Sequence, residues 1–230
     1  MRRLVIGNKN YSSWSMRPWV LMRQLGLPFE EVKLRFDDFD VSDGPFQRAV
    51  ARVSPAARVP VLVEADGFAV WDTLAIVEYL AEQHPEHTIW PREARARARA
   101  RCLAAEMHAG FSALRSHCPM NIEAALPEVG ARVLTEQPAV RRDLERITAA
   151  FGDALQASGG PFLFGDFGAI DAYYAPVAAR IRSYGLPMPQ RPVAAYLERL
   201  WAAPGVAAWV ADALAEADFL DFEEPYRKQR

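Results

Sequence analysis

The feature of this sequence that most restricts its fold is a tight turn between two short apolar runs. Residues 59–64, VPVLVE, and residues 68–71, FAVW, are separated only by Ala65, Asp66 and Gly67. Asp-Gly between two such runs predicts a β-hairpin. Strands joined by a tight turn are antiparallel, whereas parallel strands need a crossover. A sheet that contains this hairpin is therefore mixed, which argues against a doubly wound nucleotide-binding fold.

Residues 1–83 read in the order β-α-β-α-β-β-α. Strands are expected at 3–7, 30–36, 59–64 and 68–71, and helices at 15–25, 45–53 and 73–83, from the spacing of their apolar residues. The first turn lacks a glycine-rich phosphate loop, because Gly7 is followed by NKNYSS without a second glycine.

The distribution of alanine separates the chain into two parts. Residues 1–83 hold 8 alanines and residues 84–230 hold 31. Since alanine is the best helix former, the second part is expected to be helical, with helices at 93–117, 127–157, 169–184, 192–202 and 206–217. We predict a first domain at 1–83, a linker at 84–92 that contains two prolines, and an all-helical domain at 93–230.

Composition excludes several classes of protein. The 27 basic and 29 acidic side chains give a net charge of -2, which argues against a nucleic-acid partner. No apolar run approaches the roughly 18 residues of a membrane span, and the apolar start is too short for a signal peptide. Two cysteines exclude a disulfide scaffold, so a cytoplasmic location is expected.

Three segments of the first part carry residues that could do chemistry. The segment 11–18, YSSWSMRP, lies between the first strand and the first helix. Its hydroxyls predict either helix capping or an anion site that would favour a thiolate at the helix N-terminus. Pro60 opens a strand, where an ordinary trans proline is the simpler interpretation. The junction of Asp72 and Thr73 predicts a helix N-cap.

Together with a fourth segment, the order and spacing of these motifs resemble the glutathione transferase superfamily over essentially the whole chain. SSWSMR resembles the SSCSxR signature of zeta-type members, and ARVPVL resembles the segment that carries the family's cis-proline. WDTLAIVEYL is similar to the family's acid-hydroxyl junction, and GDFGAIDA to the capping motif of its helical domain, with Asp171 as a folding residue. The resemblance implies an α/β thioredoxin-like N-terminal domain with a mixed four-stranded sheet, followed by an all-α C-terminal domain.

The resemblance also implies roles in binding glutathione as a co-substrate. Ser12 or Ser13 would donate a hydrogen bond to the glutathione sulfur, and Val59, before a cis Pro60, would pair its backbone with the tripeptide. Arg58 would face the glycyl carboxylate. The remaining contacts would come from Trp14, from Asp72 at the γ-glutamyl ammonium group, and from Thr73 at the γ-glutamyl carboxylate.

The co-substrate pocket is expected to be lined from the second domain. Met107, Phe111 and Arg115 would share a helical face, and His108, Phe111 and Arg115 a similar one. The alternative is that these residues are inter-domain core or plain surface.

We therefore predict a cytoplasmic, homodimeric glutathione transferase that activates the thiol against a small hydrophobic electrophile, without a metal, a nucleic acid or a membrane. A glutathione-dependent cis-trans isomerase of the maleylacetoacetate type is an alternative, against which Trp14 in place of the signature cysteine counts. A non-catalytic binding module is another, against which the presence of Ser12, Ser13, Asp72 and Thr73 counts.

Overall fold

The computed structural model describes residues 1–37 and 43–230, and within them the first part of the chain forms a four-stranded mixed sheet. The strands are β1 (Arg3–Ile6), β2 (Glu30–Lys33), β3 (Val61–Val63) and β4 (Ala69–Trp71), in the order β2-β1-β3-β4. β1 is parallel to β2 and antiparallel to β3, and β3 is antiparallel to β4. The hairpin and the mixed sheet that the sequence predicts are thereby confirmed.

The sheet separates two apolar clusters because side chains alternate between its faces. Leu4, Ile6 and Leu62 join the main core, where they meet α1 (Ser13–Gln24) and α3 (Thr73–Gln83). Val61 and Val63 belong to a smaller cluster on the other face. α2 (Pro45–Ala51) contributes to a third cluster.

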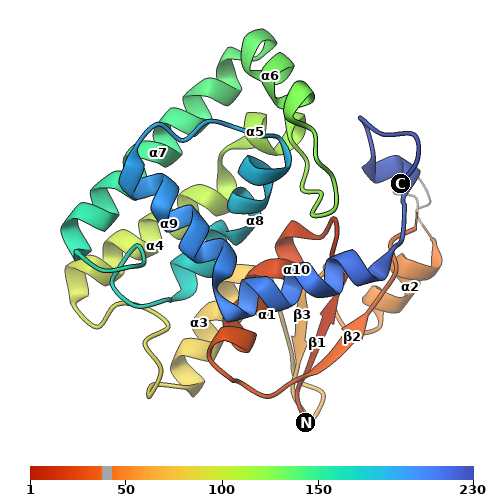
Figure 1. Cartoon of the computed structure of the whole chain (residues 1–230). Coiled ribbons are helices and arrows are strands. Elements are labelled where there is room, and N and C mark those ends of the chain that lie inside the picture. The colour runs from red at the N-terminus through yellow and green to blue at the C-terminus, as the bar shows by residue number, and fades with distance from the viewer. Residues whose placement is uncertain (38–42) are drawn as a thin grey trace.

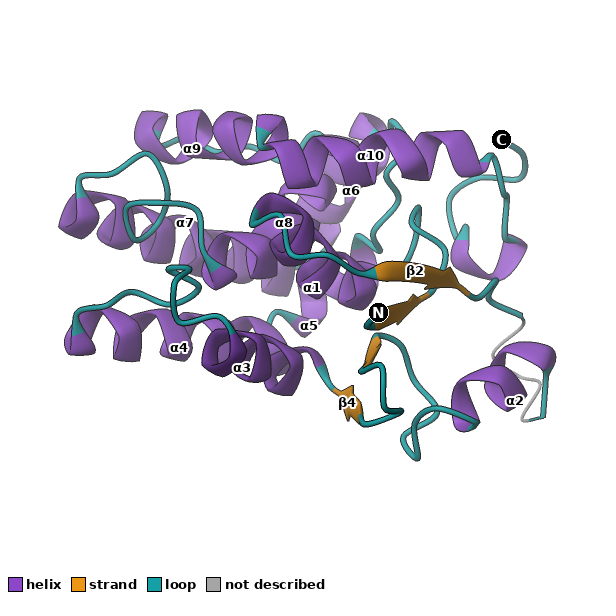
Figure 2. Cartoon of the chain, turned by 90° about the horizontal axis from the view of Figure 1, so that it is seen from below, coloured by secondary structure: helices purple, strands orange, loops and turns teal. Residues whose placement is uncertain are grey.

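The rest of the chain is helical and packs against α1 and α3 (Figures 1 and 2). Its elements are α4 (Ala94–Ala109), α5 (Ser112–His117), α6 (Pro127–Glu136), α7 (Pro138–Ser158), α8 (Ala169–Ser183), α9 (Arg191–Ala202), α10 (Pro204–Glu216) and the 3-10 helix η1 (Asp221–Glu223). The predicted linker lies between the end of α3 and the start of α4. The division into two domains stays a prediction, since one core cluster includes residues of both parts.

α8 is the central helix of this part and is almost wholly buried. Asp171 supports its start: one carboxylate oxygen accepts from the Gly168 N–H at 2.9 Å, and the other from the Leu163 N–H at 3.2 Å and the Tyr196 hydroxyl at 3.0 Å. These bonds confirm the prediction that Asp171 is a folding residue. No helix of the described ranges is both long enough and apolar enough to cross a membrane.

Two of the predicted helices are wrong as single elements. The helix expected at 93–117 ends at Ala109, because Gly110 is extended and Phe111 has a left-handed φ of 52°. The helix expected at 127–157 is interrupted at Gln137, since Pro138 disfavours the helical conformation of the residue before it.

Because this helix ends at Ala109, the prediction that Met107, Phe111 and Arg115 share one helical face is wrong. Met107 lies on α4 and Arg115 on α5, and both Met107 and Phe111 are buried in the main core. The expectation that His108, Phe111 and Arg115 share a face fails for the same reason.

Candidate active site

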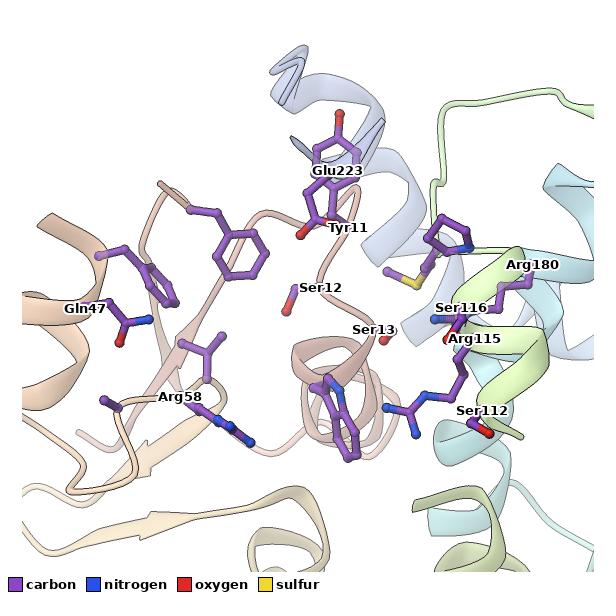
Figure 3. Close-up of a pocket in the computed structure, with 17 residues that line it drawn as sticks. Tyr11, Ser12, Ser13, Gln47, Arg58, Ser112, Arg115, Ser116, Arg180 and Glu223 are labelled. Carbon is purple, nitrogen blue, oxygen red and sulfur yellow. The ribbon is translucent and has the colours of Figure 1, made fainter. Parts of the chain in front are cut away.

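A cavity of about 720 Å³ lies where the first part of the chain meets the helices. Six of the predicted site residues line it: Ser12, Ser13, Trp14, Arg58, Val59 and Arg115. Figure 3 shows the two serines between Arg58 on one side and the side chains of α5 and α8 on the other. The cavity lining does not include Pro60, Asp72, Thr73, Met107, His108 or Phe111.

The two serines at the start of α1 differ in their hydrogen bonds. The Ser12 hydroxyl bonds to the Ser15 hydroxyl at 2.7 Å, and the latter also accepts from the Gly7 N–H at 3.2 Å. Ser12 occupies the N-cap position of α1, yet its side chain makes no capping bond, so helix capping is the wrong interpretation of this hydroxyl. Within the described residues the Ser13 hydroxyl has no hydrogen-bond partner. It lies at the N-terminus of α1, where partial positive charge favours an anion.

An extended segment forms the next wall of the cavity. The Val59–Pro60 peptide bond is cis, as the resemblance implied. In the parts of the chain that the structure describes, neither the N–H nor the C=O of Val59 makes a hydrogen bond with other backbone. Such an unpaired edge can accept one more extended peptide. The Arg58 side chain is exposed beside it.

The junction of β4 and α3 lies outside the cavity lining. The Asp72 carboxylate caps α3 by accepting from the Leu74 N–H at 2.9 Å, which confirms the predicted N-cap. It also lies 3.5 Å from His108 Nε2. Thr73 is almost fully buried, and its Oγ1 accepts a hydrogen bond from the Tyr173 hydroxyl of α8 at 2.7 Å.

Arg17 is a buried cation to which the sequence analysis gave no role. It is 1% exposed, and its Nε and Nη1 have no hydrogen-bond partner within the described part of the chain. Burial lowers the pKa of Arg17 to about 10. Its Cζ lies 4.1 Å from the Trp14 ring centroid and 4.8 Å from that of Tyr173. Its place in the sequence, between apolar Met16 and Pro18 on a helix with many apolar residues, is the signal that could have marked it.

Arginines also form the wall opposite Arg58. Arg115 lies with its Cζ 4.9 Å from the Trp14 ring centroid, and burial lowers its pKa. Arg180 of α8 donates from Nε to the Cys118 carbonyl at 2.9 Å and from Nη1 to the Pro176 carbonyl at 3.1 Å. Burial lowers the pKa of Arg180 to about 9.

This wall is therefore cationic. Across residues 1–37 and 43–230, no carboxylate forms an ion pair with Arg17, Arg115 or Arg180. The hydroxyls of Ser112 and Ser116 line the cavity on the same side. Sequence reasoning identified only Arg115 in this wall.

The C-terminal segment closes the cavity beside Tyr11. The Tyr11 hydroxyl donates to Glu224 at 2.7 Å, and the Asn121 amide donates to the same carboxylate oxygen at 2.8 Å. Burial and the hydrogen bond to Glu224 raise the pKa of Tyr11 to about 12, so Tyr11 stays neutral at physiological pH. Glu223 lines the cavity next to it, and burial together with the adjacent Glu224 raises the pKa of Glu223 to about 7.

Comparison with known proteins agrees with this arrangement. Residues 11–83 match the family described as the glutathione S-transferase N-terminal domain. A probable maleylacetoacetate isomerase of Caenorhabditis elegans is 30% identical over 107 residues, which are 46% of this chain and 49% of that protein. A zeta-class glutathione S-transferase of Euphorbia esula is 28% identical over 67% of this chain and 65% of its own. The chain thus matches about half to two thirds of the length of these relatives.

The solved structures show the same fold. The crystal structure of a glutathione transferase homologue from Burkholderia strain BGR1, which has glutathione bound, matches 93% of this chain and 98% of its own. The two share a TM-score of 0.67 and 25% sequence identity. Residues 11–83 therefore belong to the glutathione S-transferase N-terminal domain family, and the chain as a whole has the glutathione S-transferase fold and zeta-class-like relatives.

Proposed function

We propose that this chain is a glutathione transferase that holds glutathione in the cavity with its sulfur beside Ser13. The observation that carries the proposal is the unpartnered Ser13 hydroxyl at the N-terminus of α1, in a cavity that the unpaired Val59 backbone also lines. Neighbours of the same fold, such as the Burkholderia homologue, contain glutathione.

The two ends of the tripeptide would meet opposite charges. The cysteinyl backbone would pair with Val59 as an added strand, and Arg58 would face the glycyl carboxylate. The γ-glutamyl group would lie toward the N-terminus of α3, where Asp72 would face its ammonium group and Thr73 its carboxylate. The Thr73 hydroxyl accepts a hydrogen bond from Tyr173, which leaves its own O–H and the backbone N–H to donate to that carboxylate.

Catalysis would come from ionising the thiol and holding it near the electrophile. A hydrogen bond to an anion contributes about 1.5–3 kcal/mol, which lowers a thiol pKa by about one to two units. No protein base is needed once the thiol has ionised. The electrophile would occupy the half of the cavity that Arg115 and Arg180 line.

Isothermal titration calorimetry tests the proposal in two buffers of different ionisation enthalpy. Binding of reduced glutathione is expected to release protons, because the bound thiol ionises. S-Methylglutathione, which has no thiol proton, is expected to bind without that release. Absence of binding heat with both ligands would overturn the proposed function.

Turnover assays distinguish two alternatives from the proposed transferase. The names of the nematode and other relatives support an isomerase of the maleylacetoacetate type, for which turnover of a cis-configured dienoate would be diagnostic. Trp14 stands where that group has its signature cysteine, which counts against it. A non-catalytic module would bind glutathione yet turn over none of a panel of electrophiles.

We also propose a homodimer. Phe68 is 58% exposed and Trp71 is 42% exposed, both at the β3–β4 hairpin. Large apolar side chains exposed together support a protein interface there. Light scattering during gel filtration of the wild type and a Phe68→Ser, Trp71→Ser variant would test it, with a monomeric wild type as the refuting result. The cytoplasmic location stays a prediction.

A further inference from the structure

We propose that Glu223 is the proton donor to the co-substrate in the conjugate addition of glutathione to a carbonyl-activated alkene. This inference rests on the proposed transferase function and names the reaction class that the cavity is built for. It follows from the position of Glu223, the state of its carboxyl group and the other charges that line the same cavity.

Glu223 ends the 3-10 helix η1 and lines the same cavity as Ser12 and Ser13 (Figure 3). Figure 3 shows it beside Tyr11 at one end of the cavity, with the two serines below. Because Glu223 and the two serines line one cavity, a molecule bound there can lie next to both the glutathione sulfur and Glu223.

Glu223 is held there by its neighbour. The Glu224 carboxylate accepts from Tyr11 at 2.7 Å, from Asn121 at 2.8 Å and from Arg227 Nε at 2.8 Å. Burial alone would raise the pKa of Glu224, but these hydrogen bonds outweigh it and leave the pKa below its usual value. Glu224 is therefore an ionised anchor that ties η1 to the loop that carries the serines.

The carboxyl of Glu223, in contrast, is free to react. Within residues 1–37 and 43–230 its side chain makes no ion pair and no hydrogen bond. The other charged and titratable groups that line this cavity are Tyr11, Arg58, Arg115 and Arg180, and Glu224 is its neighbour on its own segment. Burial and the Glu224 charge raise its pKa to about 7, so a large fraction of Glu223 carries its proton at neutral pH. An acid with a pKa near the working pH is suited to general acid catalysis.

The cavity wall that contains Arg115 and Arg180 supplies positive charge for the anion that forms during the addition. When the thiolate sulfur bonds to the β-carbon of an unsaturated carbonyl compound, the π electron pair moves and leaves an enolate. Arg115 and Arg180, which have no carboxylate partners in the described chain, can stabilise that oxyanion. Glu223 then gives its proton to the α-carbon and regains one from water. The thiol released one proton when it ionised and the product gains one at its α-carbon, so no proton is consumed overall.

Substitution at an aromatic halide requires no such proton, because the leaving group departs as chloride. This difference gives the test. The ratio of kcat for addition to trans-4-phenyl-3-buten-2-one to kcat for substitution of 1-chloro-2,4-dinitrobenzene is measured for the wild type, Glu223→Gln and Asp221→Asn. Asp221 is an exposed acid at the start of the same η1 helix and serves as the matched control.

We expect Glu223→Gln to lower the ratio by about 10²-fold, the lower range for general acid catalysis, and Asp221→Asn to leave it at the wild-type value. In the wild type, kcat for addition falls as the pH rises through about 7, and Glu223→Gln abolishes this limb. A ratio that Glu223→Gln leaves unchanged, or a wild type that catalyses substitution but not addition, overturns the inference alone. Failure to bind glutathione overturns the proposed function as well.

Discussion

Replacing Ser13 with alanine tests the thiolate mechanism most directly. The Ser13 hydroxyl is the group at the N-terminus of α1 that has no hydrogen-bond partner in the described structure, whereas the Ser12 hydroxyl is bonded to Ser15 at 2.7 Å. If glutathione sulfur lies beside Ser13, the substitution removes one hydrogen bond to an anion. The Ser12→Ala variant removes a hydroxyl of the same kind one residue away and is the matched control.

The size of the effect follows from the hydrogen bond. Loss of about 1.5–3 kcal/mol raises the pKa of the bound thiol by about one to two units. Well below that pKa, each unit reduces the thiolate population tenfold, so turnover falls by about 10- to 100-fold. Well above it the thiol is ionised in both proteins, and the difference in turnover shrinks.

The assay is an ultraviolet titration of the thiolate band of bound glutathione, paired with the pH profile of conjugation. Ser12→Ala is expected to cost about 1 kcal/mol of unfolding free energy through its lost bond to Ser15, with a smaller change in the thiol pKa. An unchanged thiol pKa in Ser13→Ala, or a larger shift in Ser12→Ala, would refute the assignment of the sulfur to Ser13.

Three further predictions concern groups around the site. Tyr173→Phe removes the hydrogen bond to Thr73; we expect chemical denaturation to show a loss of about 1 kcal/mol and calorimetry to show weaker glutathione binding. Asp171→Ala leaves two backbone N–H groups and the Tyr196 hydroxyl without their acceptor; at about 1–3 kcal/mol for each buried orphan, denaturation should show a loss of at least 3 kcal/mol. Burial raises the folded-state pKa of Glu223 to about 7 from 4.5, so the folded chain binds this proton more tightly than the unfolded chain. The unfolding free energy therefore falls as the pH rises from about 4.5 to 7. Urea denaturation of Glu223→Gln should lack this pH dependence, and equal slopes in both proteins would contradict the assignment.

Much of the fold is predictable from the sequence because its signals are local. The turn at Ala65, Asp66 and Gly67 fixes an antiparallel pair, and the apolar spacing at 73–83 gives α3 with the bounds that the structure shows. The helix breaks were missed for a local reason too. A Cβ at residue 110 would lie 2.6 Å from the Glu106 carbonyl oxygen. Gly110 therefore lies at a close backbone contact, which the spacing of apolar residues does not indicate.

The glutathione half of the site is predictable for the same reason. Ser12 and Ser13 are adjacent in sequence, as are Arg58 and Val59, and each pair reaches the cavity from one short segment. What the sequence does not show is the state of each hydroxyl. The Ser15 hydroxyl accepts from both Ser12 and the Gly7 N–H, and the Thr73 hydroxyl accepts from Tyr173, 100 residues away.

The other half of the cavity is formed by elements far apart in the chain, and the overall composition does not indicate its positive charge. The near balance of 27 basic and 29 acidic residues argues against a nucleic-acid partner, but it is an average over the whole surface. Exposed arginines such as Arg101 and Arg146 are paired with Glu78 and Glu106. The arginines of the cavity wall have no such acid, so a chain with almost no net charge can still present a strongly cationic site. Charge balance limits the large surfaces a protein can bind, whereas the chemistry of its cavity depends on which few charges the fold leaves without partners.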